Sequence, residues 1–352
     1  NLVKKIAELF HLDLAEYETI RKFVLESFSE DNIHQNIVWI DGIAKADIDY
    51  KHIFRDKLDG AIGILRIPSM EMYLLKYAGS SNIYLNSVGI KDRHVYTFPV
   101  GSSIRSDKFD PVYYSDVVGL FLNENRNQAI SFEALDIWYY FPNHKVGLRN
   151  VSIAEESGKL IGLMGASGSG KSTLLNVLNG NLKPTKGQVL INGIDIHKDN
   201  ESISGVIGYV PQDDLLIDEL TVYQNLYYAA KLSFSNASED EIDALVQKTL
   251  HSLGIHEIQD LKVGNPLQKT ISGGQRKRVN IGLELLREPY VLFVDEPTSG
   301  LSSRDSENIM DLLKELSLKG KLIFVVIHQP SSDIFKMFDK LLILDVGGYP
   351  IY

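Results

Sequence analysis

Eight residues narrow what this chain can fold into more than any other feature: Gly165-Ala166-Ser167-Gly168-Ser169-Gly170-Lys171-Ser172. They match the pattern G-x-x-x-x-G-K-[ST] at every fixed position, and Thr173 follows them. An apolar run, residues 159–164, precedes the loop, and a helix-like segment, residues 172–178, follows it. An incidental Gly/Ser turn is the alternative, but a strand-loop-helix context is the one that this pattern requires. The sequence therefore predicts a phosphate-binding loop within an α/β fold.

The residue types of this loop predict how it binds a nucleotide. Glycines allow successive backbone N–H groups to turn inward around the phosphates, which also lie at the positive N-terminal end of the following helix. Lys171 is placed to reach the β and γ oxygens, and the Ser172 hydroxyl is placed to ligate Mg²⁺. A nucleotide polyphosphate with Mg²⁺ is therefore the expected ligand.

Two carboxylates, Asp295 and Glu296, follow a second apolar run at residues 291–294. Because the carboxyl ends of parallel strands form the ligand crevice, we expect both acids to lie beside the phosphate loop. Asp295 suits the coordination shell of Mg²⁺, and Glu296 suits a group that orients or deprotonates a water attacking the γ-phosphate. A strand end followed by a solvated turn is the alternative for this segment taken alone.

The remaining pattern from residue 130 onward predicts alternating strands and helices, with a further buried strand at residues 322–327. Ser238 and Glu241 form a capping box, and apolar positions continue at helical spacing until Gly254 ends that helix. No internal repeat is present. The sequence predicts one α/β domain with a mostly parallel sheet.

A third motif, Ser272-Gly273-Gly274-Gln275, opens a predicted amphipathic helix over residues 275–286. An ordinary helix N-cap is the alternative for Ser-Gly-Gly alone. Its position after the phosphate loop and before Asp295 resembles the ABC-type ATPases, and the resemblance covers about residues 130–352. In that comparison residues 272–275 resemble the family signature, Gln212 in Val210-Pro211-Gln212 resembles the Q-loop glutamine, and His328 resembles the switch histidine.

This resemblance implies a P-loop ATPase in which two ATP molecules lie between two copies of the domain, each completed by the signature of the other copy. A helix N-terminus with a serine hydroxyl is a good ligand for a γ-phosphate, so ATP would hold the dimer together. The implied catalytic residues are Glu296, His328 and Gln212, and the implied Mg²⁺ ligands are Ser172, Gln212 and Asp295. The implied ATP-binding residues are Phe141, Gly165, Ser167, Gly168, Ser169, Gly170, Lys171, Ser172, Thr173, Ser272, Gly273, Gly274 and Gln275.

The resemblance is less complete at two positions, the aromatic residue that stacks on adenine and the residue that follows Leu301. The family stacks adenine on an aromatic residue before the loop lysine; Phe141 is the best match, Tyr139 and Tyr140 are alternates, and a core role is the competing interpretation. After Ser299-Gly300-Leu301 the family usually has Asp, whereas this chain has Ser302. The communication across the dimer that this loop provides in the family is therefore in question here.

The segment Ile327-His328-Gln329-Pro330-Ser331-Ser332 resembles the G-type subfamily, the pigment-precursor and lipid exporters. That subfamily joins the ATPase to a transmembrane domain, so we expect a half-transporter working as a homodimer, with a transmembrane domain on the same or a partner chain. No apolar run here approaches the roughly 18 residues of a membrane span, and we interpret the chain as a piece of a longer protein. The expected location is the cytoplasmic face of the cell membrane, specifically a bacterial inner membrane.

The residues before the ATPase predict two further parts. Residues 1–34 carry apolar positions at helical spacing and faintly resemble the helical TerB-like module. Residues 35–128 carry short β-rich runs that predict a small all-β sandwich, in which Asn82-Ile83-Tyr84-Leu85-Asn86 resembles the end of a forkhead-associated domain. The expected order is helical segment 1–34, β-sandwich 35–128 and ATPase 129–352. A regulatory or packing role is the simpler interpretation of the sandwich, and phosphopeptide-dependent regulation is the alternative.

The amino-acid composition argues against several other classes of protein. The chain of 352 residues has no cysteine, which excludes disulfides and thiol chemistry, and its net charge of -10 argues against a nucleic-acid partner. A soluble ABC ATPase of the repair or translation type remains the rival. Its repair members insert long coiled coils between loop and signature, and its translation members carry two cassettes, whereas here the gap lacks a heptad run and only one phosphate loop is present.

Overall fold

The computed structural model describes residues 14–25, 34–44, 50–70, 72–122, 130–142, 144–198, 205–234, 237–265 and 270–351. The chain divides into two compact units, Asn1–Phe121 and Leu122–Tyr352. Residues 1–13 and 26–33 of the predicted helical segment 1–34, and the domain boundary predicted between residues 128 and 129, lie outside the described residues. The boundary predicted between residues 34 and 35 stays a prediction.

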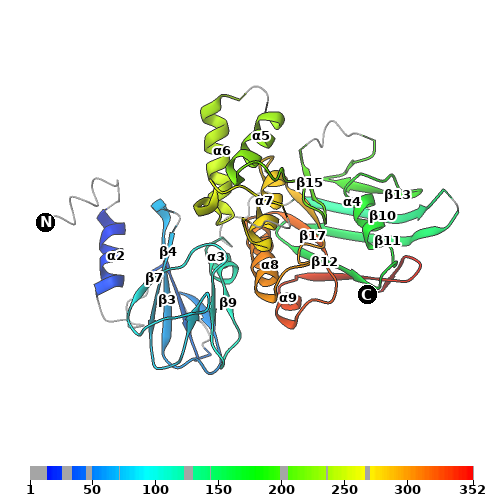
Figure 1. Cartoon of the computed structure of the whole chain (residues 1–352). Helices are drawn as coiled ribbons and strands as arrows, with labels where there is room; N and C mark the ends of the chain where they lie inside the picture. Colours follow the sequence, from blue (N-terminus) through cyan, green and yellow to red (C-terminus); the bar gives the residue numbers. More distant parts are fainter. Residues whose placement is uncertain are drawn as a thin grey trace. The chain divides into compact units, whose positions relative to one another are not determined.

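The first unit is rich in short strands, as its sequence pattern predicts (Figure 1). One sheet has the order β2-β1-β3-β4-β7 and another the order β6-β5-β8-β9, with only β1 and β2 parallel among the described pairs. The packing of these two sheets into an all-β sandwich stays a prediction. The described elements are α2 (Leu14–Leu25), β1 (Ile37–Asp41), β2 (Lys51–Phe54), β3 (Ala61–Ile67), η2 (Pro68–Met70), β4 (Met72–Ala78), β5 (Tyr84–Leu85), β6 (Val88–Gly89), β7 (Val95–Thr97), β8 (Ser103–Arg105), β9 (Val112–Tyr113) and α3 (Tyr114–Leu122).

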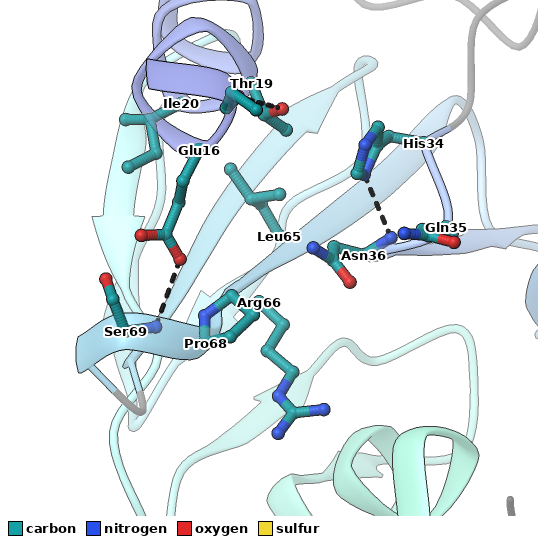
Figure 2. A pocket seen from close by; sticks show the side chains of 11 residues that line it. Glu16, Thr19, Ile20, His34, Gln35, Asn36, Leu65, Arg66, Pro68 and Ser69 are labelled. Atoms are coloured by element: carbon teal, nitrogen blue, oxygen red, sulfur yellow. Dashed lines mark hydrogen bonds between the residues drawn. The ribbon is translucent and has the colours of Figure 1, made fainter. Parts of the chain in front are cut away.

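Helix α2 is tied to this β-rich unit by polar contacts at both ends. Near its beginning, Glu16 Oε1 accepts a hydrogen bond of 3.1 Å from the backbone N–H of Ser69 (Figure 2). At its end, the buried Lys76 of β4 donates to the carbonyls of Phe23 and Val24 at 2.9 and 3.2 Å. The last carbonyls of a helix lack partners within the helix, and the lysine ammonium supplies donors to two of them.

The second unit alternates strands and helices as predicted, and its elements lie close to the predicted segments. Its described elements are β10 (Ser131–Tyr140), β11 (Val146–Glu156), β12 (Leu160–Gly165), α4 (Lys171–Leu178), β13 (Lys186–Ile191), β14 (Ile194–Asp195), β15 (Ile207–Val210), α5 (Val222–Ser233), α6 (Glu239–Ser252), η3 (His256–Ile258), α7 (Gly273–Leu285), β16 (Val291–Asp295), α8 (Ser303–Leu318), β17 (Leu322–Val326), α9 (Ser332–Lys336), β18 (Lys340–Asp345) and β19 (Tyr349–Ile351). The predicted capping box of α6 is confirmed, since the Ser238 side chain accepts from Glu241 N and the Glu241 side chain accepts from Ser238 N.

A parallel sheet of order β15-β16-β17-β12-β18-β19 forms the centre of this unit, and only the β18/β19 pair is antiparallel. The mostly parallel sheet is therefore confirmed. A second, antiparallel sheet of order β11-β10-β13-β14 was not predicted. Helix α4 contacts β11 of the antiparallel sheet as well as β12, β16 and β17 of the parallel one. The helix that follows the phosphate loop is thus held by both sheets.

Three phenylalanines join the two sheets in one apolar core. Phe293 and Phe324 stack with ring centroids 5.0 Å apart, and Phe132 of the antiparallel sheet lies 6.0 and 5.2 Å from them. All three side chains are fully buried, and Leu174 and Leu175 of α4 belong to the same cluster. The strands that carry the functional residues are therefore anchored by close-packed rings.

We expect Phe293→Leu to lower the free energy of unfolding of this unit by about 1 to 2 kcal/mol, because the smaller side chain leaves a gap between two rings. Urea denaturation followed by circular dichroism measures the change. Tyr290→Leu is the matched control, since Tyr290 precedes the same strand but is 54% exposed. If Phe293→Leu lowered the free energy of unfolding no more than the control does, the three-ring packing would not stabilise this unit as proposed.

Within the described part of the chain, every helix is too short or too polar to cross a bilayer.

Candidate functional site

The phosphate loop connects β12 to α4, and its backbone requires glycine at two positions. Gly165 has φ 151°, and a Cβ atom there would lie 2.2 Å from the carbonyl oxygen of Leu344. Gly170 caps α4 with φ 102°, and a Cβ atom there would lie 2.7 Å from the carbonyl oxygen of Gly147. Neither position has room for a side chain, and positive φ is strained for other residues. The glycines of the motif therefore fix the loop against β18 and β11.

The other residues of the loop differ in exposure. Ser167, Gly168 and Ser172 are exposed, whereas Thr173 is half-buried. Ser169 is only 1% exposed, and its hydroxyl has no hydrogen-bond partner in the described structure. The exposed members of the loop are therefore accessible to a ligand.

Lys171, the first residue of α4, bends back over the loop. Its Nζ donates hydrogen bonds of 2.9 Å to the carbonyl oxygens of Gly165 and Ala166. Burial lowers the pKa of Lys171, while the nearby charges of Glu296 and Asp295 act in the opposite direction. The ammonium group therefore lies on the loop, within electrostatic reach of the two predicted acids.

Asp295 is the last residue of β16 and is 8% exposed. Burial, followed by the charge of Glu296, raises the pKa of its carboxyl group. Its Oδ1 atom is buried with no hydrogen-bond partner in the described structure. A buried, unpaired carboxylate oxygen is costly, so this atom has unused capacity for a cation or a donor.

Glu296 lies at the centre of a three-residue cluster at one edge of the sheet. Its Oε2 accepts a hydrogen bond of 3.0 Å from Gln212 Nε2, and its Oε1 lies 2.8 Å from His328 Nε2. Its backbone N–H donates to the carbonyl of Val326, and its φ of 43° marks a sharp change of chain direction. The three side chains follow β15, β16 and β17, which are neighbours in the sheet. The predicted Q-loop glutamine, acid and histidine are thus brought together.

The predicted signature begins α7 as an N-cap. Ser272 Oγ accepts from the backbone N–H of Gln275 at 3.1 Å, and Gln275 Oε1 accepts from Ser272 N at 2.8 Å. Gly273 is exposed, and Gly274 is buried, where a Cβ atom would lie 3.0 Å from Asp305 Oδ1. The N-cap interpretation is therefore correct as far as the local structure goes, and a ligand-binding role for Ser272 stays a prediction.

The signature and the phosphate loop belong to different parts of the second unit. Helix α7 contacts α5, α6, α8 and β15, and Figure 1 shows α5 and α6 with it in yellow-green to yellow. Among the described residues, no hydrogen bond or ion pair joins residues 272–275 to residues 165–172. The signature of this chain does not complete the chain's own phosphate loop here.

The prediction of an amphipathic α7 was only partly right. Lys277 and Asn280 are buried together with apolar residues such as Val279 and Ile281. Elements pack on α7 from several sides, so polar side chains on this helix are enclosed as well as apolar ones. Sequence periodicity detects one apolar face and gives no sign of an enclosed polar face.

The polar residues that join α7 to the segment after Gln212 were not predicted from the sequence. Arg276 Nε and Nη2 donate to the two carboxylate oxygens of Asp214 at 2.6 and 3.0 Å, and Nη2 donates to Asp218 Oδ1 at 2.8 Å. Lys277 Nζ donates to the carbonyl oxygen of Gln212 at 2.7 Å. The sequence offered a signal of charge alone: three basic residues, 276–278, directly follow the signature, and two aspartates follow Gln212.

Phe141 lies at the end of β10, near the phosphate loop. Its ring meets that of Tyr139 edge to face, with centroids 5.2 Å apart. A Cβ atom at Gly147 would lie 2.8 Å from Phe141 Cε2, and Gly147 is the residue whose carbonyl approaches Gly170. Tyr140 instead stacks on Trp138, as expected for the other face of the strand. Phe141 and Tyr139 therefore lie on one side, and Tyr140 on the other.

The donor set at this site fits a hard cation. The unpaired Oδ1 of Asp295, the exposed hydroxyl of Ser172 and the amide oxygen of Gln212 are oxygen ligands of the kind that Mg²⁺ prefers. In the described residues no group of three or more His, Asp or Glu side chains is placed to hold a metal by itself. Magnesium in nucleotide sites is normally held by one or two protein oxygens together with phosphates, so the set is sufficient.

The geometry defines a class of protein: an α/β ATPase with a phosphate-binding loop after β12 and two acids at the end of β16.

A family model described as ABC transporter matches residues 148–299. The chain is 42% identical over 192 residues to the ABC-type transporter claG of Penicillium crustosum, which covers 54% of this chain and 26% of that protein. It is 38% identical over 226 residues to ABC transporter G family member 13 of Arabidopsis thaliana, covering 62% and 33%.

A solved structure, cbiO1 from Clostridium perfringens, described as part of the ABC transporter complex cbiONQ, has a TM-score of 0.56 and 30% identity. The match covers 63% of this chain and 86% of cbiO1. The chain belongs to the ABC transporter family, of which it carries the ATP-binding domain, and its relatives include members of the G family. Such a domain binds ATP and implies ATP hydrolysis. The chain spans about a quarter to a third of the two curated relatives.

Proposed function

We propose that residues 129–352 hydrolyse ATP to drive an exporter of the G type, with Glu296 as the catalytic carboxylate. The observation that carries this proposal is the position of Glu296 between Gln212 and His328, next to the loop that holds Lys171. Phosphoryl transfer needs positioning and charge stabilisation more than covalent chemistry. An acid held at both oxygens beside a phosphate loop supplies the positioning.

Each residue has a proposed task. Lys171 exchanges its bonds to the loop carbonyls for the β and γ oxygens of ATP, and the loop N–H groups bind the remaining phosphate charge. Glu296 accepts a proton from, or orients, the attacking water, and His328 contacts the γ-phosphate. Ser172, Asp295 and Gln212 hold Mg²⁺, which when bound neutralises phosphate charge.

We also propose that two copies of the domain bind two ATP molecules between them. Ser272 is exposed at the N-terminus of α7, where free N–H groups and the helix dipole favour an anion. Because no hydrogen bond or ion pair among the described residues joins residues 272–275 to their own phosphate loop, the loop of a second copy is their proposed partner. Removal of the γ-phosphate would then weaken the dimer.

A test of the ATPase proposal measures phosphate release by the full chain with ATP, once with Mg²⁺ and once with EDTA. We expect release only with Mg²⁺. Steady release in EDTA, or none in Mg²⁺ while ATP still binds, would overturn the proposed chemistry.

We propose Phe141 as the adenine platform. Stacking on an aromatic ring contributes about 0.5 to 1.5 kcal/mol beyond the buried area, so Phe141→Ala should weaken ATP binding roughly tenfold. Isothermal titration measures the dissociation constant. Tyr140→Ala is the control, because Tyr140 stacks on Trp138 and lies on the other face of β10. An unchanged affinity for Phe141→Ala, or an equal loss in both variants, would contradict this assignment.

The proposed partner is a transmembrane domain, on the same chain or another, at the cytoplasmic face of a membrane. Leu215 and Ile217, 67% and 53% exposed, follow Gln212 and offer an apolar surface close to the site. A bacterial inner membrane stays a prediction.

The gene beyond the codon for Tyr352 tests the half-transporter proposal, which expects about six spans of roughly 20 apolar residues. A gene without them would move the membrane domain to a separate chain.

For residues 35–128 we propose a forkhead-associated-like sandwich that regulates the ATPase. In support, β5 and β6 form a two-residue hairpin at Asn86 and Ser87, whose φ angles of 51° and 70° suit such a turn. The Asn86 side chain donates to Ser102 Oγ and accepts from Ser103 N, so it braces the hairpin. Binding of threonine-phosphorylated peptides at micromolar concentration would favour phosphopeptide control, and its absence would leave a packing role.

A further inference from the structure

Three residues of α7 hold the chain segment that follows Gln212. Arg276 binds Asp214 through two parallel hydrogen bonds and also reaches Asp218 and the carbonyl of Gly264. Asn280 Oδ1 accepts from the backbone N–H of Leu215 at 3.2 Å. Together with the bond from Lys277 to the Gln212 carbonyl, these contacts bind residues 212–218 along one side of the helix.

These contacts are stronger than ordinary surface ion pairs. The Arg276 side chain is 18% exposed and that of Asp214 27%, and their geometry is the two-pronged form that guanidinium and carboxylate favour. Burial works against the charge of Asp214, but Arg276 outweighs it and lowers the pKa of that carboxyl group. Lys277 is 8% exposed, and its ammonium group donates a hydrogen bond to the backbone carbonyl of Gln212. Water therefore competes weakly for any of these groups.

We propose that Arg276 and Lys277 are positioning residues, which tie the beginning of α7 to residues 212–218 and thereby set the contact between Gln212 and Glu296. This inference rests on the proposed function of Glu296. Gln212 has its backbone carbonyl on Lys277 and its side chain on Glu296, so a shift of α7 must move the amide relative to the carboxylate.

The consequence is a link between two nucleotide sites. Ser272 lies four residues before Arg276, and in the proposed dimer it contacts ATP on the loop of the other copy. Arg276 and Lys277 adjust the Gln212 and Glu296 pair of their own copy. Occupation of one ATP site thereby reaches the hydrolytic residues of the other through one turn of α7.

The test is steady-state ATP hydrolysis by the full chain and by Asp214→Asn, Arg276→Lys and the double variant. Asp214→Asn keeps the shape and removes the charge, whereas Arg276→Lys keeps the charge and removes the fork. We expect each single change to lower kcat roughly 10- to 100-fold, because small displacements of catalytic groups have effects of this size. KM and the dissociation constant for ATP should stay close to the wild-type values, whereas Tm should fall by roughly a few degrees because a partly buried ion pair is lost. The double variant should be no slower than the worse single variant, since both break one interaction.

Glu239→Gln is the matched control. It removes a carboxylate from an exposed ion pair with Lys231 in the same helical region, away from residues 212–218. Its kcat should equal that of the wild type.

Three outcomes overturn the inference. An unchanged kcat in Asp214→Asn shows that the pair does not position Gln212, and Asp214→Asn decides the matter if Arg276→Lys fails to fold. An ATP affinity that falls by as large a factor as kcat, together with a lower Tm, shows that the contacts only hold the fold. A wild-type chain that binds but does not hydrolyse ATP overturns the proposed function and this inference together, which separates that failure from the first two.

Discussion

Glu296→Gln is expected to stop ATP turnover while leaving ATP bound. A general base contributes roughly 10²- to 10⁴-fold to a reaction, so we expect kcat to fall about a thousandfold. The amide has the shape of the carboxylate and can still accept from Gln212, so the site should keep its structure. Because the γ-phosphate is no longer removed, ATP should then hold two copies together.

Phosphate release measures the loss of turnover, and sedimentation with ATP and Mg²⁺ measures the dimer. Glu288→Gln is the control, since it removes a 62% exposed carboxylate that pairs with Lys248 far from the loop in sequence. Glu296 would not be the catalytic carboxylate if its glutamine variant hydrolysed ATP at the wild-type rate. A variant that is inactive but remains monomeric with bound ATP would refute the proposed dimer only.

Lys171→Ala is expected to abolish tight ATP binding. The ammonium group supplies the positive side chain nearest the loop, and hydrogen bonds to charged groups contribute about 1.5 to 3 kcal/mol each. Losing two such bonds to phosphate oxygens should weaken binding by at least about 100-fold. Within the fold the same group donates to two carbonyls of the loop, so the free energy of unfolding should fall much less than the free energy of ATP binding.

Isothermal titration with ATP and Mg²⁺ measures this change, and thermal unfolding without nucleotide checks that the domain is intact. Lys183→Ala removes the same charge from an exposed position just beyond α4 and should bind ATP like the wild type. Undiminished affinity in Lys171→Ala would count against the phosphate-loop assignment.

The local motifs could be predicted from sequence because neighbouring residues determine them. Only glycine has room at positions 165 and 170, and an apolar strand delivers Asp295 to its own end. The capping residues of α6 likewise lie three positions apart, within one turn. Such features need no knowledge of the rest of the fold.

The enclosed polar face of α7 could not be predicted in the same way. Lys277 and Asn280 look like the solvent side of an amphipathic helix, and they are buried because other elements surround that helix. Their partners, Gln212 and Leu215, are more than 60 residues away in sequence. Hydrophobic periodicity records which residues avoid water and does not record which polar groups find partners.

The sequence by itself determined that this chain has a nucleotide loop, two acids at a strand end and a capped signature helix, because each depends on steric and hydrogen-bonding rules among adjacent residues. Only the tertiary structure decided that Gln212, Glu296 and His328 meet. They follow β15, β16 and β17, and the order of those strands is set by burial of apolar surface between segments distant in sequence, such as Phe132, Phe293 and Phe324. That burial is non-directional and non-local, so it leaves no short pattern that a reader of the sequence could recognise.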